Sequence, residues 1–98
     1  MPELYRDEML AYRDLFDSDL APKLAEALAK ARRKHPDYAY SAHGAWTVIG
    51  DELMELKRAI ESESEARQWA EAMDVAVTAV RFLLGEHKKH VDKVEQSG

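Results

Sequence analysis

Residues 41–84 read SAHGAWTVIGDELMELKRAI, ESES and EARQWAEAMDVAVTAVRFLL, which are two apolar segments around a short charged break. The first segment repeats large apolar residues at spacings of three and four, namely Trp46, Ile49, Leu53, Leu56 and Ile60. This repeat predicts a helix whose core face is a heptad-like stripe. The second segment is apolar around most of its circumference, which predicts a largely buried helix. We therefore expect the two segments to fold back on each other within an all-α fold.

Each of these segments carries two acids three residues apart, Glu52 with Glu55 and Glu71 with Asp74. Residues at this spacing are neighbours on one face of a helix. If the helices are adjacent, four carboxylates converge in a largely apolar setting, which is costly unless a cation neutralises them. Carboxylate oxygens are ligands that Mg2+ prefers. The pattern predicts that these four acids hold Mg2+ (or Mn2+) and that the ion binds a polyphosphate. It also predicts that the acids act in catalysis.

A second interpretation of the same acids is a network of salt bridges on a solvated seam. Arg67, Arg81 and Lys57 are the available partners. A single acidic pair would favour this interpretation, whereas two pairs on adjacent helices favour a metal site. Arg81 lies two turns beyond Asp74 on the same face, and Lys57 follows Glu55, so both are candidate phosphate ligands. Arg81 is equally a candidate structural partner of the acids.

An irregular segment, HPDYAYSAHG (35–44), precedes the first acidic pair. A nucleobase needs an aromatic or apolar wall, so the aromatic and histidine side chains here, with Trp46, are candidate base contacts. His43 and Trp46 are the two that we assign to the base. The alternative is that Tyr38 and Tyr40 fill the end of the helical bundle.

Composition limits the classes of function. The 98 residues suit a single domain, and 46% hydrophobic with 34% charged residues indicate a folded chain. A net charge of -5 disfavours nonspecific binding to nucleic acid or to an anionic membrane. There is no cysteine, which excludes disulfides and thiolate metal sites. No signal peptide or membrane-length apolar run is evident, so we expect a cytoplasmic protein.

Four helices are predicted, at about 2–16, 19–34, 43–61 and 63–90, with no strand. Ser62 and Glu65 fit a capping box for the last helix. His87 and His90 lack a third nearby ligand, so we expect them to be exposed. The helix over 63–90 is apolar on too many sides for one chain to cover. We therefore expect this helix to lie near the interface of a homodimer or homotetramer.

The order Glu52-Leu-Met-Glu55, fifteen residues, then Glu71-Ala-Met-Asp74 resembles the signature of the all-α, MazG-like nucleoside triphosphate pyrophosphohydrolases. The flanks AHGAWTVIGDELMEL and EAMDVAVTAVRFL are similar to small MazG-like proteins of phages and bacteria. The resemblance covers about residues 24–84. One departure is Asp51, where many members carry a further Glu.

This resemblance implies a four-helix MazG-like bundle and the hydrolysis of a nucleoside triphosphate, which we expect to be a deoxynucleotide, to a nucleoside monophosphate and pyrophosphate. Related enzymes in the superfamily act on phosphoribosyl-ATP, dUTP or dCTP, and the motif acids do not separate these substrates. A helical interaction module without catalysis is the alternative from another class. Di-iron carboxylate bundles use Glu-x-x-His pairs, and neither motif here contains His.

Overall fold

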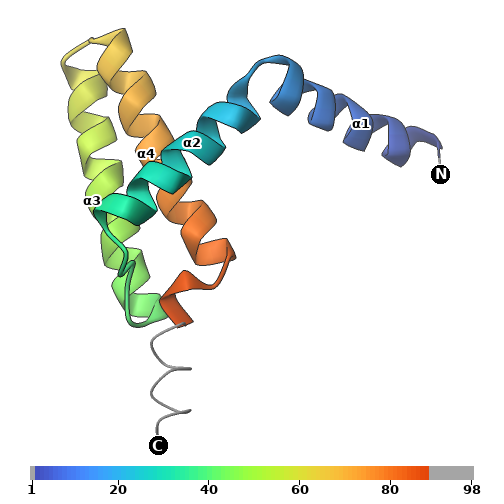
Figure 1. Ribbon diagram of the computed structural model, residues 1–98. Helices are drawn as coiled ribbons and strands as arrows, with labels where there is room; N and C mark the ends of the chain where they lie inside the picture. Colours follow the sequence, from blue (N-terminus) through green and yellow to red (C-terminus); the bar gives the residue numbers. More distant parts are fainter. Residues whose placement is uncertain (1, 89–98) are drawn as a thin grey trace, which may run out of the picture.

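The computed structural model describes residues 2–88, which form four α-helices and one short 3-10 helix and contain no β-strand (Figure 1). The elements are α1 (Pro2–Asp17), α2 (Leu20–Lys34), α3 (Ala42–Glu61), α4 (Glu65–Leu83) and η1 (Glu86–Lys88). The predicted all-α class with four helices is confirmed. Three of the four predicted helices begin and end within one residue of those observed.

The bounds predicted for the last helix are wrong at both ends. The N-cap of α4 is Ser64, whose Oγ accepts a hydrogen bond from the backbone N–H of Arg67 at 3.4 Å. Ser62 instead ends α3, because its own N–H donates to the carbonyl of Arg58. At the other end, Gly85 has a φ of 75°, a left-handed conformation that glycine adopts at little cost and that ends α4. Residues 89 and 90 of the predicted helix lie outside the described residues.

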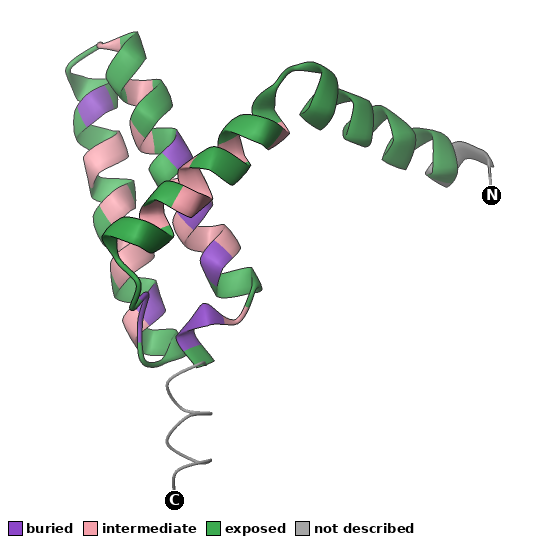
Figure 2. Cartoon of the chain, in the orientation of Figure 1, coloured by how far each residue is buried: buried purple, intermediate pink, exposed green. Residues whose placement is uncertain are grey.

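The antiparallel pair of α3 and α4 is the most extensively packed part of the chain (Figure 1). Three residues of the predicted heptad stripe do not face inward, since Trp46, Leu53 and Ile60 are 70%, 54% and 54% exposed. The other two members of the stripe, Ile49 and Leu56, are half-buried. The fully buried side chains of α3 are Ala45 and Ala59 (Figure 2). Small side chains let two helices approach closely, so the flank that carries the alanines and acids packs inward.

The loop between α2 and α3 closes one end of this pair. Tyr38 and Ala39 pack with Ala45 in a small buried cluster. The hydroxyl of Tyr38 donates to the backbone carbonyl of Thr78 on α4 at 2.7 Å. Tyr38 therefore fills the end of the helical body, whereas Tyr40 is exposed.

A buried ion network fastens α2 and the C-terminal turn to α4. Glu86 accepts hydrogen bonds from Arg81 Nε at 2.7 Å and from Arg32 Nη2 at 2.6 Å. Arg81 also donates to the carbonyl of His35 at 2.9 Å. Burial raises the pKa of Glu86, but the hydrogen bonds and charges of Arg32 and Arg81 outweigh burial and hold that pKa below its usual range. The expected exposure of His87 is wrong, because His87 is buried and its ring stacks on Phe82. His90 lies outside the described residues.

Helix α1 projects away from the other helices and packs only against α2 among the described elements (Figure 1). Over residues 5–17, the part of α1 whose burial the structure describes, the large apolar side chains are all exposed (Figure 2). They are Tyr5, Met9, Leu10, Tyr12, Leu15 and Phe16. The packed body therefore consists of α2, α3, α4 and η1. None of the described helices combines the length and the apolar character needed to cross a membrane.

We predict that Glu86→Gln lowers the free energy of unfolding by about 3 kcal/mol, because it leaves the buried guanidinium of Arg81 without a counter-charge. Urea unfolding followed by circular dichroism measures this. The matched control is Glu61→Gln, which breaks an exposed pair with Lys57 and should cost about 0.5 kcal/mol or less. Equal losses in the two variants would contradict a stabilising role of the network.

Candidate metal centre

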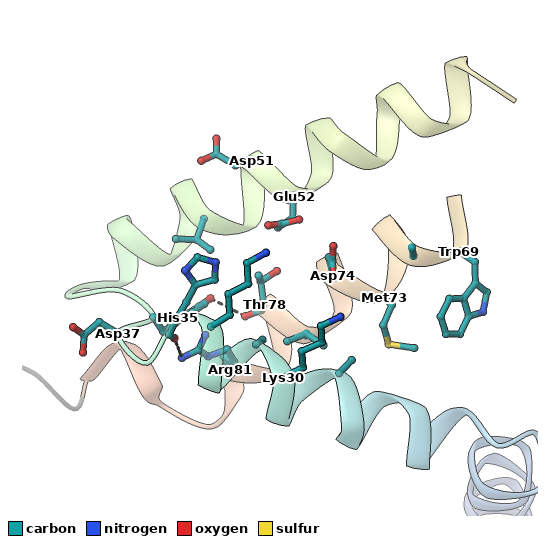
Figure 3. Close-up of a pocket in the computed structure, with 17 residues that line it drawn as sticks. Lys30, His35, Asp37, Asp51, Glu52, Trp69, Met73, Asp74, Thr78 and Arg81 are labelled. Carbon is teal, nitrogen blue, oxygen red and sulfur yellow. Dashed lines mark hydrogen bonds between the residues drawn. The ribbon is translucent and has the colours of Figure 1, made fainter. Parts of the chain in front are cut away.

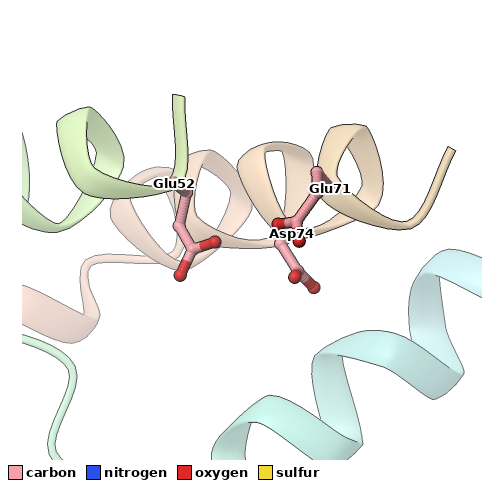
Figure 4. Close-up of side chains that lie close together, drawn as sticks. All are labelled: Glu52, Glu71 and Asp74. Atoms are coloured by element: carbon pink, nitrogen blue, oxygen red, sulfur yellow. The ribbon is translucent and has the colours of Figure 1, made fainter. Parts of the chain in front are cut away.

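Three of the four predicted acids come together between α3 and α4. One carboxylate oxygen from each of Glu52, Glu71 and Asp74 lies within 4.8 Å of the other two (Figure 4). Glu52 comes from α3, while Glu71 and Asp74 lie one turn apart on α4. The arrangement arises because the inward-facing flank of α3 carries Glu52 opposite the acidic stripe of α4.

The fourth predicted acid, Glu55, does not belong to this group. Its Oε1 accepts a hydrogen bond from Arg58 Nη1 at 2.6 Å, one turn along the same helix. The carboxylate is half-buried. A local i, i+3 ion pair therefore holds Glu55 away from the three converging carboxylates.

Glu52 and Glu71 are half-buried and Asp74 is exposed, and the electrostatics of Glu52 reflect its burial first and the neighbouring carboxylates second. Burial raises the pKa of Glu52, and the negative charges of Asp74 and Glu71 raise it further, with smaller contributions from Glu55 and Asp51. A divalent cation at this position would reverse that effect, because it favours the ionised carboxylates. The donor set is made of oxygens only, which suits hard cations such as Mg2+ or Mn2+ rather than soft metals.

A pocket of about 590 Å3 opens beside the three acids, enclosed by α2, the loop after it, α3 and α4 (Figure 3). This volume falls in the range of about 300–1,000 Å3 typical of small-molecule sites. Its lining combines apolar, acidic and basic side chains. The apolar ones include Val48, Trp69, Met73 and Val77, the acids include Asp51, Glu52 and Asp74, and the bases include Lys30, Lys34 and Arg81.

The two predicted phosphate ligands lie in different surroundings. Arg81 lines the pocket, but its guanidinium is bound to Glu86 and to the carbonyl of His35, and stacks 4.9 Å from the ring centre of Tyr38. Arg81 is thus a structural partner of Glu86, and not of the four acids of the paired motifs. Lys57 is exposed beside Glu61 and is not among the described residues that line the pocket.

The predicted base contacts His43 and Trp46 are both exposed, and neither is among the described pocket residues. The aromatic side chain at the pocket that sequence reasoning missed is Trp69. The basic side chains it missed are Lys30 and Lys34. The sequence does contain a pattern that predicts a basic face on α2. The lysines at 23, 30 and 34 and the alanines at 27 and 31 lie on one side of this helix.

Comparison of the chain with models of protein families, with curated proteins and with solved structures gave no match. The site is therefore interpreted from its own residues and geometry.

The raised pKa of Glu52 predicts how stability depends on pH without metal. Below about pH 4.5, the ordinary value for this group, Glu52 is protonated in both the folded and unfolded chain and has no net effect. As pH rises through the higher folded-state pKa, ionisation costs stability. We therefore expect Glu52→Gln to melt above wild type at neutral pH, with no difference in acid.

Divalent ions should reverse this order. With Mg2+ at neutral pH, wild type should melt above Glu52→Gln, because only the intact group binds the ion well to the native state. Differential scanning calorimetry of both proteins across pH, with Mg2+ or a chelator, measures both effects. A melting difference that stays constant with pH and with Mg2+ would refute the metal centre.

Proposed function

We propose that this protein is a Mg2+-dependent nucleoside triphosphate pyrophosphohydrolase, which releases a nucleoside monophosphate and pyrophosphate. The observation that carries the proposal is the convergence of Glu52, Glu71 and Asp74 at the edge of a pocket with apolar walls. Like charges this close repel one another, which a bound cation would relieve, and a pocket with basic side chains opposite them suits an anionic ligand of the cation. The resemblance of the paired motifs to the MazG-like family agrees with this chemistry.

The three acids and the apolar side chains of the pocket have different proposed roles around Mg2+. Glu52, Glu71 and Asp74 would hold Mg2+, which when bound supplies charge neutralisation at the phosphates and orients a water molecule. Val48, Met73 and Val77 supply apolar surface in the pocket, which would limit the contact of bulk water with a bound substrate. In the overall reaction, water adds across the anhydride bond between the α- and β-phosphates, and pyrophosphate leaves.

Glu55 has a different predicted role from the other acids. Because it is paired with Arg58, it can join the ion only after that pair opens. We assign the metal first to the three converging carboxylates and keep Glu55 as a further ligand. The substrate base and sugar remain open within the class, so deoxynucleotides, phosphoribosyl-ATP, dUTP and dCTP are all included in the screen below.

We predict that Asp74→Asn, Glu71→Gln and Glu52→Gln each reduce pyrophosphate release by roughly 100-fold or more, because each removes a charged ligand without changing volume. Glu55→Gln should cause a smaller loss, since Glu55 lies outside the converging group. A screen of ribo- and deoxynucleoside triphosphates and of phosphoribosyl-ATP with Mg2+, scoring pyrophosphate, measures this. Cooperative melting of each variant is the control for folding.

A wild-type rate in Asp74→Asn would sink the hydrolase proposal. The competing class is then a helical interaction module. One observation favours it independently, which is the number of apolar side chains exposed on α1 and on the outer face of α3. In that case nucleotides and Mg2+ should have no effect on the protein.

We also propose that the chain forms a homo-oligomer through the outer stripe of α3. Trp46, Leu53 and Ile60 follow one another at seven-residue intervals and are more than half exposed. Such a stripe is typical of a helix that pairs with another helix in a coiled-coil manner. Pairing with the same stripe of a second copy would give a two-fold symmetric contact. The sequence placed the helix over 63–90 near the interface, which is a different surface, and that placement stays a prediction.

We predict that Leu53→Lys weakens self-association by about a hundredfold or more, because two copies of Leu53 each lose about 2 kcal/mol of burial. Met54→Lys is the matched control, since Met54 is also exposed but lies off the heptad. Sedimentation equilibrium over micromolar concentrations measures both. A monomeric wild type, or an equal effect of the two changes, would refute this interface.

A further inference from the structure

The pocket has an aromatic end and a basic end, and the acids lie between them. Trp69 lies at one end of the pocket, while His35 and Arg81 lie at the other (Figure 3). Glu52 and Asp74 occupy the middle of the same view. A long substrate that spans the pocket therefore has only two orientations, and the chemistry of the ends distinguishes them.

Contacts between α2 and α4 establish this order independently of the view. Lys23 Nζ, near the start of α2, lies 5.8 Å from the ring centre of Trp69. Arg32, near the end of α2, binds Glu86, which in turn binds Arg81. The two helices thus run in the same direction along the pocket. Later residues of α2 lie beside later residues of α4.

The pocket lysines are Lys30 and Lys34, one turn apart on α2. Lys34 directly precedes His35, which lies at the end away from Trp69, while Lys30 lies across from Asp74 (Figure 3). Both are exposed, and in the described part of the chain neither takes part in an ion pair. Arg81 differs, because its charge is already matched by Glu86. The two lysines are therefore the cations that can bind a new anion without breaking an existing pair. Ala27 and Ala31 beside them leave room for it.

The opposite end suits an aromatic ring. Trp69 is 54% exposed, which leaves part of its ring surface available for stacking. Met73, one turn further along α4, is buried and contributes a polarisable apolar surface. The contact from Lys23 holds one side of the indole. The other rings among the described side chains of the pocket are Tyr38, which is buried and hydrogen-bonded to Thr78, and the imidazole of His35 at the end away from Trp69.

We infer that a nucleoside triphosphate binds with its base on Trp69 and its β- and γ-phosphates against Lys30 and Lys34. This orientation, which rests on the proposed function, places the α-phosphate beside Glu52 and Asp74. The leaving pyrophosphate then lies between Lys30, across from Asp74, and Lys34, next to His35. The reverse orientation would place the β- and γ-phosphates against Trp69 and the buried Met73, and would forgo their contact with Lys34.

The phosphate half of this inference is tested with inorganic tripolyphosphate and Mg2+ as the probe. Lys30→Gln and Lys34→Gln should each weaken its binding about tenfold in isothermal titration calorimetry, because each removes one charged contact. Lys30→Arg and Lys34→Arg should restore most of the affinity. Lys57→Gln, an exposed lysine away from the pocket, is the matched control and should leave affinity unchanged.

The base half is tested by tryptophan fluorescence, because the chain has only two tryptophans. The probes are α,β-methylene deoxynucleoside triphosphates of the four bases with Mg2+, which cannot be hydrolysed. In Trp46→Phe, where Trp69 is the remaining indole, at least one probe should quench the emission, while tripolyphosphate should not. In Trp69→Phe, where Trp46 remains, the same probe should leave the emission unchanged.

The outcomes separate this inference from the proposed function. Quenching in Trp69→Phe but not in Trp46→Phe would overturn the orientation, and so would unchanged tripolyphosphate affinity in the lysine variants. If wild type releases pyrophosphate in either case, the hydrolase proposal stands. The predicted binding pattern without pyrophosphate release would support the orientation and refute catalysis. Absence of any binding would overturn both.

Discussion

The carboxylate of Glu86 is the constraint on which the pocket depends. It joins the end of α2 through Arg32 and the end of α4 through Arg81, while Arg81 also holds the carbonyl of His35. Without this network, α2 would be held to the rest mainly by its packing on α4. The lysines of the pocket would then lose their fixed position. A buried pair of this kind is a weak source of stability compared with apolar packing, but it is specific in position.

Charge is distributed differently on the two sides of the pocket, and both distributions follow from helix geometry. The acids lie on the inner flank of α3 and on one stripe of α4, where close packing forces them together. The lysines lie on α2 at a spacing of one turn, where nothing in the described residues pairs with them. An anion that carries its own cation satisfies both sides at once. That complementarity, more than the acids alone, favours a metal-bound polyphosphate.

The sequence predicted the helices and the acidic pairs because both depend on local spacing. It did not predict which face of α3 turns inward, since two faces are apolar and the choice depends on how closely Ala45 and Ala59 let α4 approach. The separation of Glu55 from the other acids depends on competition from Arg58. Arg32 and Glu86 are 54 residues apart, and no local pattern links residues so distant. The role of the α2 lysines became apparent only once α2 was placed opposite the acids.

The isolation of α1 separates its side chains from those of the pocket and of the buried cluster. No described side chain of α1 contributes to the pocket beside the acids or to the buried cluster around Tyr38. Substitutions in α1 therefore do not change the side chains of the site. The sequence of α1 is limited only by what its apolar face contacts. In a comparison of related chains, α1 and the body would therefore change at independent rates. If the sequence of α1 were constant among related chains, the reason would be a binding partner rather than catalysis.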